Sequence, residues 1–327
     1  MSDNNQTMEF EFAGDDVVVP FAVEPLDIRG RAVQVGPMLD QILKRHEYPD
    51  DVCFLLSELI VLATLLGTSL KFEGNFIVQT QSDGPVSLTV VDFSTPGSVR
   101  AYARFDKNAV ETAVREGRTS PRDMLGNGVM ALTVDQGSHM QRYQGIVELK
   151  GDTLEEVAHQ YFRQSEQIPT RIRLTVAQVM RKEPGDEAVN QSWRAGGILT
   201  QFLPASQSRV VVRDLPGGND EDEDGVADDD AWLEASALMD TVADDELSDP
   251  QLNVERLLYR LFHEHGVRVF EGTQVLDQCS CSREKVLSLV KSFEDEPDKK
   301  GAGEEGFETR CEFCSTVYRI EAQELGW

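Results

Sequence analysis

Two closely spaced cysteine pairs near the C-terminus constrain this chain more than any other feature. Four of the five cysteines lie in the last 49 residues, as a C-x-C pair, Cys279 and Cys281, and a C-x-x-C pair, Cys311 and Cys314, separated by 29 residues. Each pair can place two sulfurs on one ion, and the long segment between them lets two separate turns converge on it. We therefore expect these four cysteines to bind one tetrahedral zinc ion.

A shell of four cysteines predicts a structural or regulatory zinc site. Catalytic zinc keeps a position open for water, and four protein ligands leave none. The nearby H-x-H, His263 and His265, is therefore interpreted as a pair of ordinary helix-end residues. Four basic residues can offset part of the negative charge of the site: Arg283, Lys285, Arg310 and Arg319.

The C-terminal segment, residues 273–327, is short and contains the polar stretch FEDEPDKKGAGEEG, so it has little core of its own. Structural zinc contributes roughly 10–16 kcal/mol of apparent binding free energy, comparable with the stability of a whole domain. Loss of zinc should therefore unfold this segment. Accessible thiolates react with oxidants, and a disulfide between Cys279 and Cys281 would close a small, easily reduced ring. These properties are typical of a reversible switch.

Charge marks the organisation of the rest of the chain. The formal net charge is -27, and residues 217–250 hold 14 Asp or Glu and no Lys or Arg. The densest part, residues 217–231, has too little apolar surface to offset the entropy of ordering, so we expect an acidic disordered insertion there. Such a charge disfavours binding to nucleic acid phosphates and to anionic membranes.

Residues 1–216 are predicted to form one α+β domain, because strand-like and helix-like stretches follow each other. FIVQTQ and VSLTVVDF are separated by the turn sequence SDGP, and GVMALTVDQ and GIVELKG also have the pattern of strands. TLEEVAHQYFRQSEQ has the helical period, with Thr153 and Glu156 as a capping box.

The longest apolar run, Val52 to Leu66, spans only 15 residues and contains Ser57 and Glu58, so it is interpreted as a buried helix and not as a membrane span. The N-terminal sequence has neither the positively charged segment nor the apolar stretch of a secretory signal, which favours a cytoplasmic location. In that reducing compartment, clustered thiols bind metal or do redox chemistry more often than they form stable disulfides. Cys53, inside the apolar run, is expected to be an inert core residue.

Residues 232–272 are predicted to form a helical linker. Ser248, Asp249 and Pro250 supply a helix start, and Gly266 supplies its end. Apolar residues between them fall on one helical face: Val254, Leu257, Leu258, Leu261 and Phe262. This face needs a partner, which is either the first domain or a regulated client-binding surface.

The motifs together resemble the heat shock protein 33 family of redox-regulated holdase chaperones, over most of the chain. CSCSRE followed by CEFC and Tyr318 is similar to the zinc motif of that family. GNFIVQTQSDGP, LGNGVMALTVD, YQGIVELKGDTLEEVAHQYFRQSEQIPT and WRAGGILTQFLP resemble stretches of its N-terminal domain.

The resemblance implies an α+β chaperone domain, a helical redox-responsive linker and a small C-terminal zinc domain. It implies a non-enzyme that is zinc-bound and inactive when reduced. Oxidation would form disulfides between Cys279 and Cys281 and between Cys311 and Cys314, release zinc and unfold the linker. The active form, a homodimer, would then bind unfolding client proteins without ATP.

Two other classes share the cysteine pattern. A zinc-ribbon nucleic-acid binder should show a basic face, which the charge argues against. A thiol oxidoreductase would place a C-x-x-C at a helix start in a thioredoxin-like unit, whereas here two further cysteines accompany the pair. The acidic insertion and the Gly-rich spacer between the pairs depart from the family pattern and predict a zinc domain that opens readily.

Overall fold

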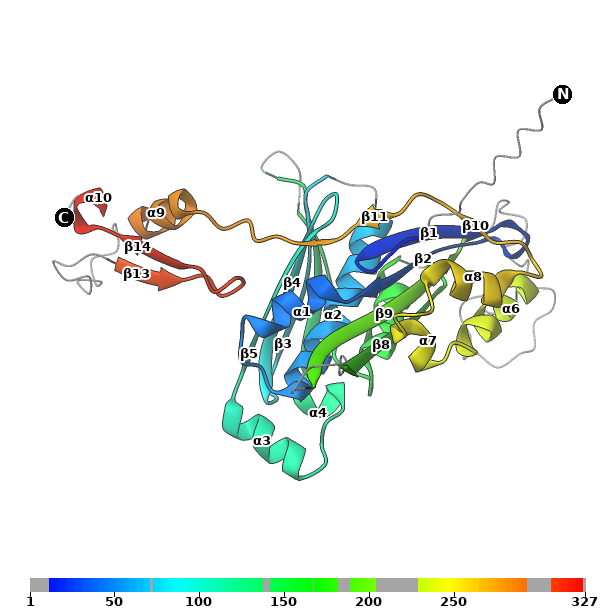
Figure 1. The fold of residues 1–327 in the computed structure, drawn as a ribbon, viewed down its shortest axis with the longest axis horizontal. Helices are drawn as coiled ribbons and strands as arrows, with labels where there is room; N and C mark the ends of the chain where they lie inside the picture. The colour runs from blue at the N-terminus through cyan, green and yellow to red at the C-terminus, as the bar shows by residue number, and fades with distance from the viewer. Residues whose placement is uncertain are drawn as a thin grey trace, which may run out of the picture.

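The computed structural model describes residues 12–70, 73–137, 142–166, 168–181, 189–203, 229–292 and 307–325. The expected acidic insertion, most of residues 217–231, and the spacer at 293–306 lie outside the described residues. The fold is mixed α+β, as the sequence predicts (Figure 1).

Two sheets form the core domain: the first is antiparallel throughout, and the second is antiparallel except for the parallel pair of β12 with β5. The first sheet has the strand order β10-β1-β2-β9-β8, with β11 also paired to β1. The second sheet has the order β12-β5-β4-β3-β6-β7. The strands of the first sheet are β1 (Val17–Val23), β2 (Ile28–Val35), β8 (Thr170–Arg181), β9 (Asn190–Phe202), β10 (Arg268–Val269) and β11 (Thr273–Gln274). Those of the second are β3 (Asn75–Ser82), β4 (Val86–Ser94), β5 (Ser98–Phe105), β6 (Gly128–Asp135), β7 (Tyr143–Glu148) and β12 (Leu276–Asp277).

Helix α2 (Asp50–Ser69) packs against strands of both sheets and forms the centre of the main core. Its length and composition would allow it to cross a membrane, but 78% of its most apolar window is buried inside the protein. The apolar run around Val52 to Leu66 is thus a core helix, as predicted. Cys53 is buried in it, and burial raises the pKa of its thiol to about 12, which makes it inert.

Shorter helices complete the core domain. They are α1 (Pro37–Lys44), α3 (Lys107–Arg115), α4 (Pro121–Leu125), α5 (Leu154–Tyr161), the 3₁₀ turn η1 (Glu24–Leu26) and the π turn η2 (Phe162–Glu166). The strands predicted around SDGP and the helix after Thr153 are present. The predicted capping box is only half formed: Thr153 accepts from the Glu156 amide, but the Glu156 carboxylate accepts from the Asp152 amide, one residue earlier than expected.

Three helices of the linker region cover the outer face of the first sheet: α6 (Asp230–Asp240), α7 (Asp244–Ser248) and α8 (Val254–Phe262) (Figure 1). Strand β1, VVVPFAV, is apolar at both sets of alternating positions, so each of its faces needs cover. Val18 faces the α2 core, while Val19, Phe21 and Val23 face a second core shared with α6 and α8.

The predicted face of α8 is fully buried in this second core, so in this structure the helix packs on the first domain. The predicted helix start is wrong. Ser248 ends α7, Asp249 and Pro250 lie in the turn, and the Asn253 side chain caps α8 by accepting from the Arg256 amide at 3.1 Å. Helix α6 also begins at Asp230, inside the stretch expected to be an insertion.

The C-terminal part follows an extended segment, residues 268–277, which runs along both sheets as β10, β11 and β12 (Figure 1). Beyond it lie α9 (Arg283–Ser292), the hairpin of β13 (Phe307–Arg310) and β14 (Val317–Ile320), and α10 (Ala322–Leu325). Residues 273–277, expected to begin the zinc domain, thus pair with strands of the core sheets.

Candidate metal centre and linker seat

The structure brings the four C-terminal cysteines together. Cys279 and Cys281 lie between β12 and α9, and Cys311 and Cys314 lie in the turn between β13 and β14. Their four Sγ atoms all lie within 4.8 Å of one another. Cys279 Sγ is 3.8 Å from Cys311 Sγ, and Cys281 Sγ is 3.3 Å from Cys314 Sγ. Sulfurs about 2.3 Å from a tetrahedral zinc are about 3.8 Å apart, so this donor set fits zinc.

The backbone of the hairpin turn shapes the C-x-x-C pair. Ser315 adopts a left-handed conformation with φ of 57°, and its amide donates to the Cys311 carbonyl at 2.9 Å. Burial raises the pKa of the Cys311 thiol, and the amides of Phe313 and Cys314, which point at its sulfur, partly oppose that rise. The turn therefore places the Cys311 sulfur next to amide donors, and hydrogen bonds from such donors favour the thiolate form.

Side-chain hydroxyls lie next to two of the sulfurs. Tyr318 Oη is 2.9 Å from Cys281 Sγ, and Thr316 Oγ1 is 3.2 Å from Cys314 Sγ. Burial raises the pKa of Cys281. Burial acts in the same direction on Cys314, but hydrogen bonds, first of all from Thr316, outweigh it and lower its pKa to about 6. The cluster thus contains at least one thiol that ionises easily.

Two of the four basic residues expected beside the cysteines pair with acidic side chains instead. Arg283 pairs with Glu324, and Arg319 pairs with Glu308. The cation that reaches a sulfur comes from the core domain: Arg100 Nη1 donates to Cys279 Sγ at 3.8 Å. No local sequence pattern indicates this contact, because the two residues are 179 positions apart.

The two histidines of the H-x-H lie apart from the cysteine cluster, as predicted. His263 Nδ1 contacts the Arg260 carbonyl at 3.2 Å, and His265 Nε2 contacts Glu234 at 3.0 Å. Among the described residues, the metal-ligating group is made by the four cysteines alone.

The C-terminal part has almost no apolar core. Helix α9 has no buried residue. From Cys279 onward, Ile320 is the one fully buried side chain among those whose burial the structure describes. The order of this part therefore depends mainly on what joins the cysteines.

A second contact region, missed from the sequence, is the place where α7 packs on β9, called here the seat of α7. Buried Arg194 donates from both terminal nitrogens to Asp15, at 2.6 and 2.5 Å, and from Nε to the Ser248 carbonyl at 3.0 Å. A Cβ on Gly196 would lie 2.0 Å from the Leu247 carbonyl oxygen, so only glycine allows α7 to lie this close. Arg194 and Gly196 both belong to the motif WRAGG, the one sequence signal that could have indicated this contact.

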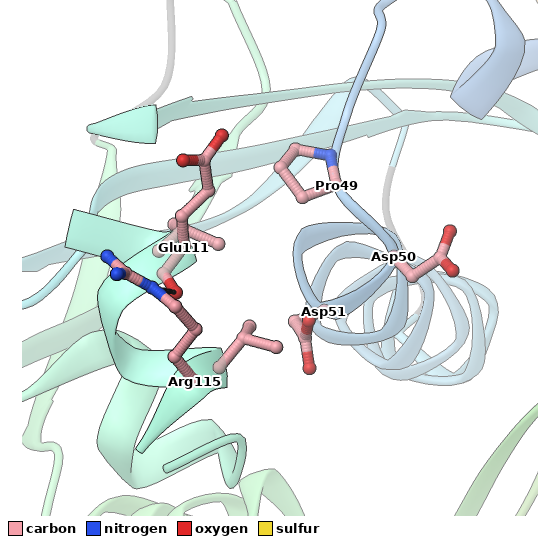
Figure 2. A pocket seen from close by; sticks show the side chains of 7 residues that line it. Pro49, Asp50, Asp51, Glu111 and Arg115 are labelled. Carbon is pink, nitrogen blue, oxygen red and sulfur yellow. Dashed lines mark hydrogen bonds between the residues drawn. The ribbon is translucent and has the colours of Figure 1, made fainter. Parts of the chain in front are cut away.

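A pocket lies between the start of α2 and α3. Its lining includes Pro49, Asp50, Asp51, Glu111 and Arg115. Figure 2 shows that these polar side chains point in different directions and do not converge on one point. Binding and catalytic pockets need a few converging polar groups, so this pocket carries no argument for catalysis.

Known proteins match the chain along nearly its whole length. The family model described as "Hsp33 protein" matches residues 16–321. The 33 kDa chaperonin of Caulobacter vibrioides (strain NA1000 / CB15N) is 42% identical over 310 residues, which cover 94% of this chain and 95% of that protein. The 33 kDa chaperonin of Escherichia coli O7:K1 (strain IAI39 / ExPEC) is 32% identical over 306 residues, 93% of this chain and 92% of that protein.

A solved structure shares the fold. The crystal structure of the 33 kDa chaperonin (heat shock protein 33 homolog) from Thermotoga maritima superimposes with a TM-score of 0.70 at 18% sequence identity, and covers 95% of this chain and 97% of that one. The family match and the two sequence relatives, with the fold and the four-cysteine cluster beside them, lead to one assignment: the chain belongs to the Hsp33 family.

Proposed function

We propose that this protein is an ATP-independent holdase chaperone, not an enzyme, and that the redox state of its cysteine cluster controls it. The observation that carries the proposal is the convergence of four free thiols within 4.8 Å in a part of the chain that has almost no core. The names of the relatives, 33 kDa chaperonins, support the chaperone activity. The clients are unfolding proteins, and the compartment is the cytoplasm.

In the reduced state, Cys279, Cys281, Cys311 and Cys314 hold the C-terminal part together. Zinc, when bound, would keep all four as thiolates and join the two turns. Tyr318 and Thr316 orient the sulfurs beside them. The extended segment 268–277 then stays paired to the sheets, and α6 to α8 cover the outer face of the first sheet.

Oxidation converts each pair of thiolates into a disulfide, Cys279 with Cys281 and Cys311 with Cys314. Each pair gives up two electrons as its S–S bond forms, and one hydrogen peroxide takes those electrons with two protons and becomes two waters. A disulfide within each pair leaves no sulfur to connect the two turns. The C-terminal part then loses the link on which its order depends.

The linker is poised to respond to this loss. Burying the five apolar side chains of α8 contributes roughly 10 kcal/mol. Ordering its nine residues costs about 9 to 18 kcal/mol of chain entropy. The two terms are of similar size, so α8 is held only marginally on the sheet. Its release exposes the apolar residues of the second core to unfolding clients, and two opened copies associate as a homodimer.

The test compares reduced, metal-loaded protein with peroxide-oxidised protein as inhibitors of aggregation of a heat-unfolded client, while a chromophoric chelator follows zinc release. We expect protection only after oxidation, together with release of one zinc per chain. Equal protection in both states would exclude redox control. Reduction of insulin, or salt-dependent binding of DNA or RNA, would indicate an oxidoreductase or a nucleic-acid binder instead.

A further inference from the structure

The turn that carries the C-x-x-C pair lies against the core domain. The Phe313 carbonyl is 3.2 Å from His46 Nε2, and Ser315 Oγ donates to the Arg45 carbonyl at 3.4 Å. Figure 1 shows this turn pointing from β13 and β14 towards the second sheet. The cysteines are therefore held between the C-terminal part and the core domain, and not by the C-terminal part alone.

One side chain of the core domain contacts both Cys279 and the turn that carries the C-x-x-C pair. Arg100 of β5 donates from Nε and Nη2 to Asp92 Oδ2, at 2.9 and 2.5 Å, and from Nη1 to Cys279 Sγ at 3.8 Å. Its guanidinium carbon lies 4.3 Å from the centre of the Phe313 ring. Phe313 sits between Cys311 and Cys314, so one guanidinium contacts the C-x-C pair by a hydrogen bond and the C-x-x-C turn by stacking.

The position of Arg100 is fixed by the core domain. Asp92 of β4 is 5% exposed, and β4 pairs with β5 so that Asp92 lies opposite Arg100. The parallel pairing of β12 with β5 brings the chain to Cys279 beside the same side chain. Arg45 holds Asp277, two residues before Cys279, by a bidentate ion pair whose carboxylate is 2% exposed. The sulfur and the guanidinium are therefore both anchored to β5.

We propose that Arg100 is a positioning residue of the cysteine site, which ties metal retention and thiol reactivity to the folded core domain. This inference rests on the proposed metal site. A planar guanidinium can bind a carboxylate, donate to a sulfur and stack on a ring at once, which the single ammonium of lysine cannot do. Donation to Cys279 withdraws charge from its sulfur, and stacking on Phe313 restrains the turn of the other pair.

The experiment uses the full-length reduced protein loaded with Co²⁺, whose thiolate charge-transfer band reports the sulfurs, and with Zn²⁺ for competition against a chelator. We compare Arg100→Met and Arg100→Lys with Arg104→Met. Arg104 lies on the same strand, hydrogen-bonds with Tyr102 and pairs with the exposed carboxylate of Glu312 at 3.9 Å, so it controls for lost charge.

Arg100→Met should weaken metal binding by about 10-fold or more, the usual effect of losing a group that orients a ligand, and should shift the charge-transfer band. Arg100→Lys should restore part of the band position but not the affinity. Arg104→Met should change the affinity by less than about twofold. Equal effects of Arg100→Met and Arg104→Met, or no effect of either, would overturn the inference.

Arg100→Met leaves Asp92 in a buried position, where its Oδ1 already has no hydrogen-bond partner among the described residues. The double variant Asp92→Asn/Arg100→Met removes that buried charge, and Phe313→Leu removes only the stacking. Both should also weaken metal binding if Arg100 positions the site. Failure of the wild-type protein to bind metal would sink the proposed function itself, whereas tight wild-type binding that none of these variants changes would sink this inference alone.

Discussion

Replacing Phe262 with alanine should release α8 and activate the reduced protein. Phe262 is fully buried and stacks on Phe21 of β1 with ring centres 5.7 Å apart. Removing a buried phenylalanine costs about 3–5 kcal/mol. A loss of 3 kcal/mol shifts the ratio of docked to released helix more than about 100-fold. Because α8 is only marginally held, this shift populates the released form.

Two measurements check this prediction on reduced, metal-loaded protein. Amide hydrogen exchange within Val254–Phe262 should speed up by about two orders of magnitude, and aggregation of a heat-unfolded client should be suppressed without any oxidant. Metal affinity should fall as well, because a linker whose docking is coupled to the bound metal affects metal binding in return. Tyr259→Ala is the matched control, since Tyr259 lies on the same helix and is 65% exposed. Rapid exchange of α8 without client protection would refute the idea that the linker covers the client-binding surface.

Three further changes test other parts of the molecule. Cys314→Ser should weaken zinc binding by more than about 100-fold and abolish redox control, and retained stoichiometric zinc in a chelator titration would contradict the four-thiolate site. Gly196→Val should displace α7 and give activity in the reduced state, whereas Gly14→Ala, where an added Cβ meets nothing within 4 Å, should not. Burial, and then repulsion by Glu155, raises the pKa of Glu58 from 4.5 to about 7, so its contribution to stability is complete below about pH 4.5 and is lost as the pH rises through 7. Glu58→Gln should remove this loss, and urea unfolding of both proteins at pH 5 and pH 8 should show a difference between them that grows with pH.

The sequence predicts well those features that are written in local patterns. The cysteine spacing indicates four ligands that can meet, and the alternation around SDGP gives the strands of the second sheet. Ser248 and Pro250 predict a start of α8 that is too early, because they have the pattern of a helix start, whereas Asn253 caps the helix. Contacts between distant segments, such as Arg100 with Cys279, have no local pattern and become visible only when strand pairing aligns β12 with β5.

The extended segment 268–277 has a mechanical consequence. Its residues pair with β1 at one border of the first sheet and with β5 at one border of the second, so a single stretch of chain closes both. Its detachment would expose the edges of β1 and β5 together. The unpaired amides and carbonyls of each edge could then pair with an extended polypeptide. Detachment of this segment would therefore expose unpaired backbone hydrogen-bonding groups and apolar side chains in a single event.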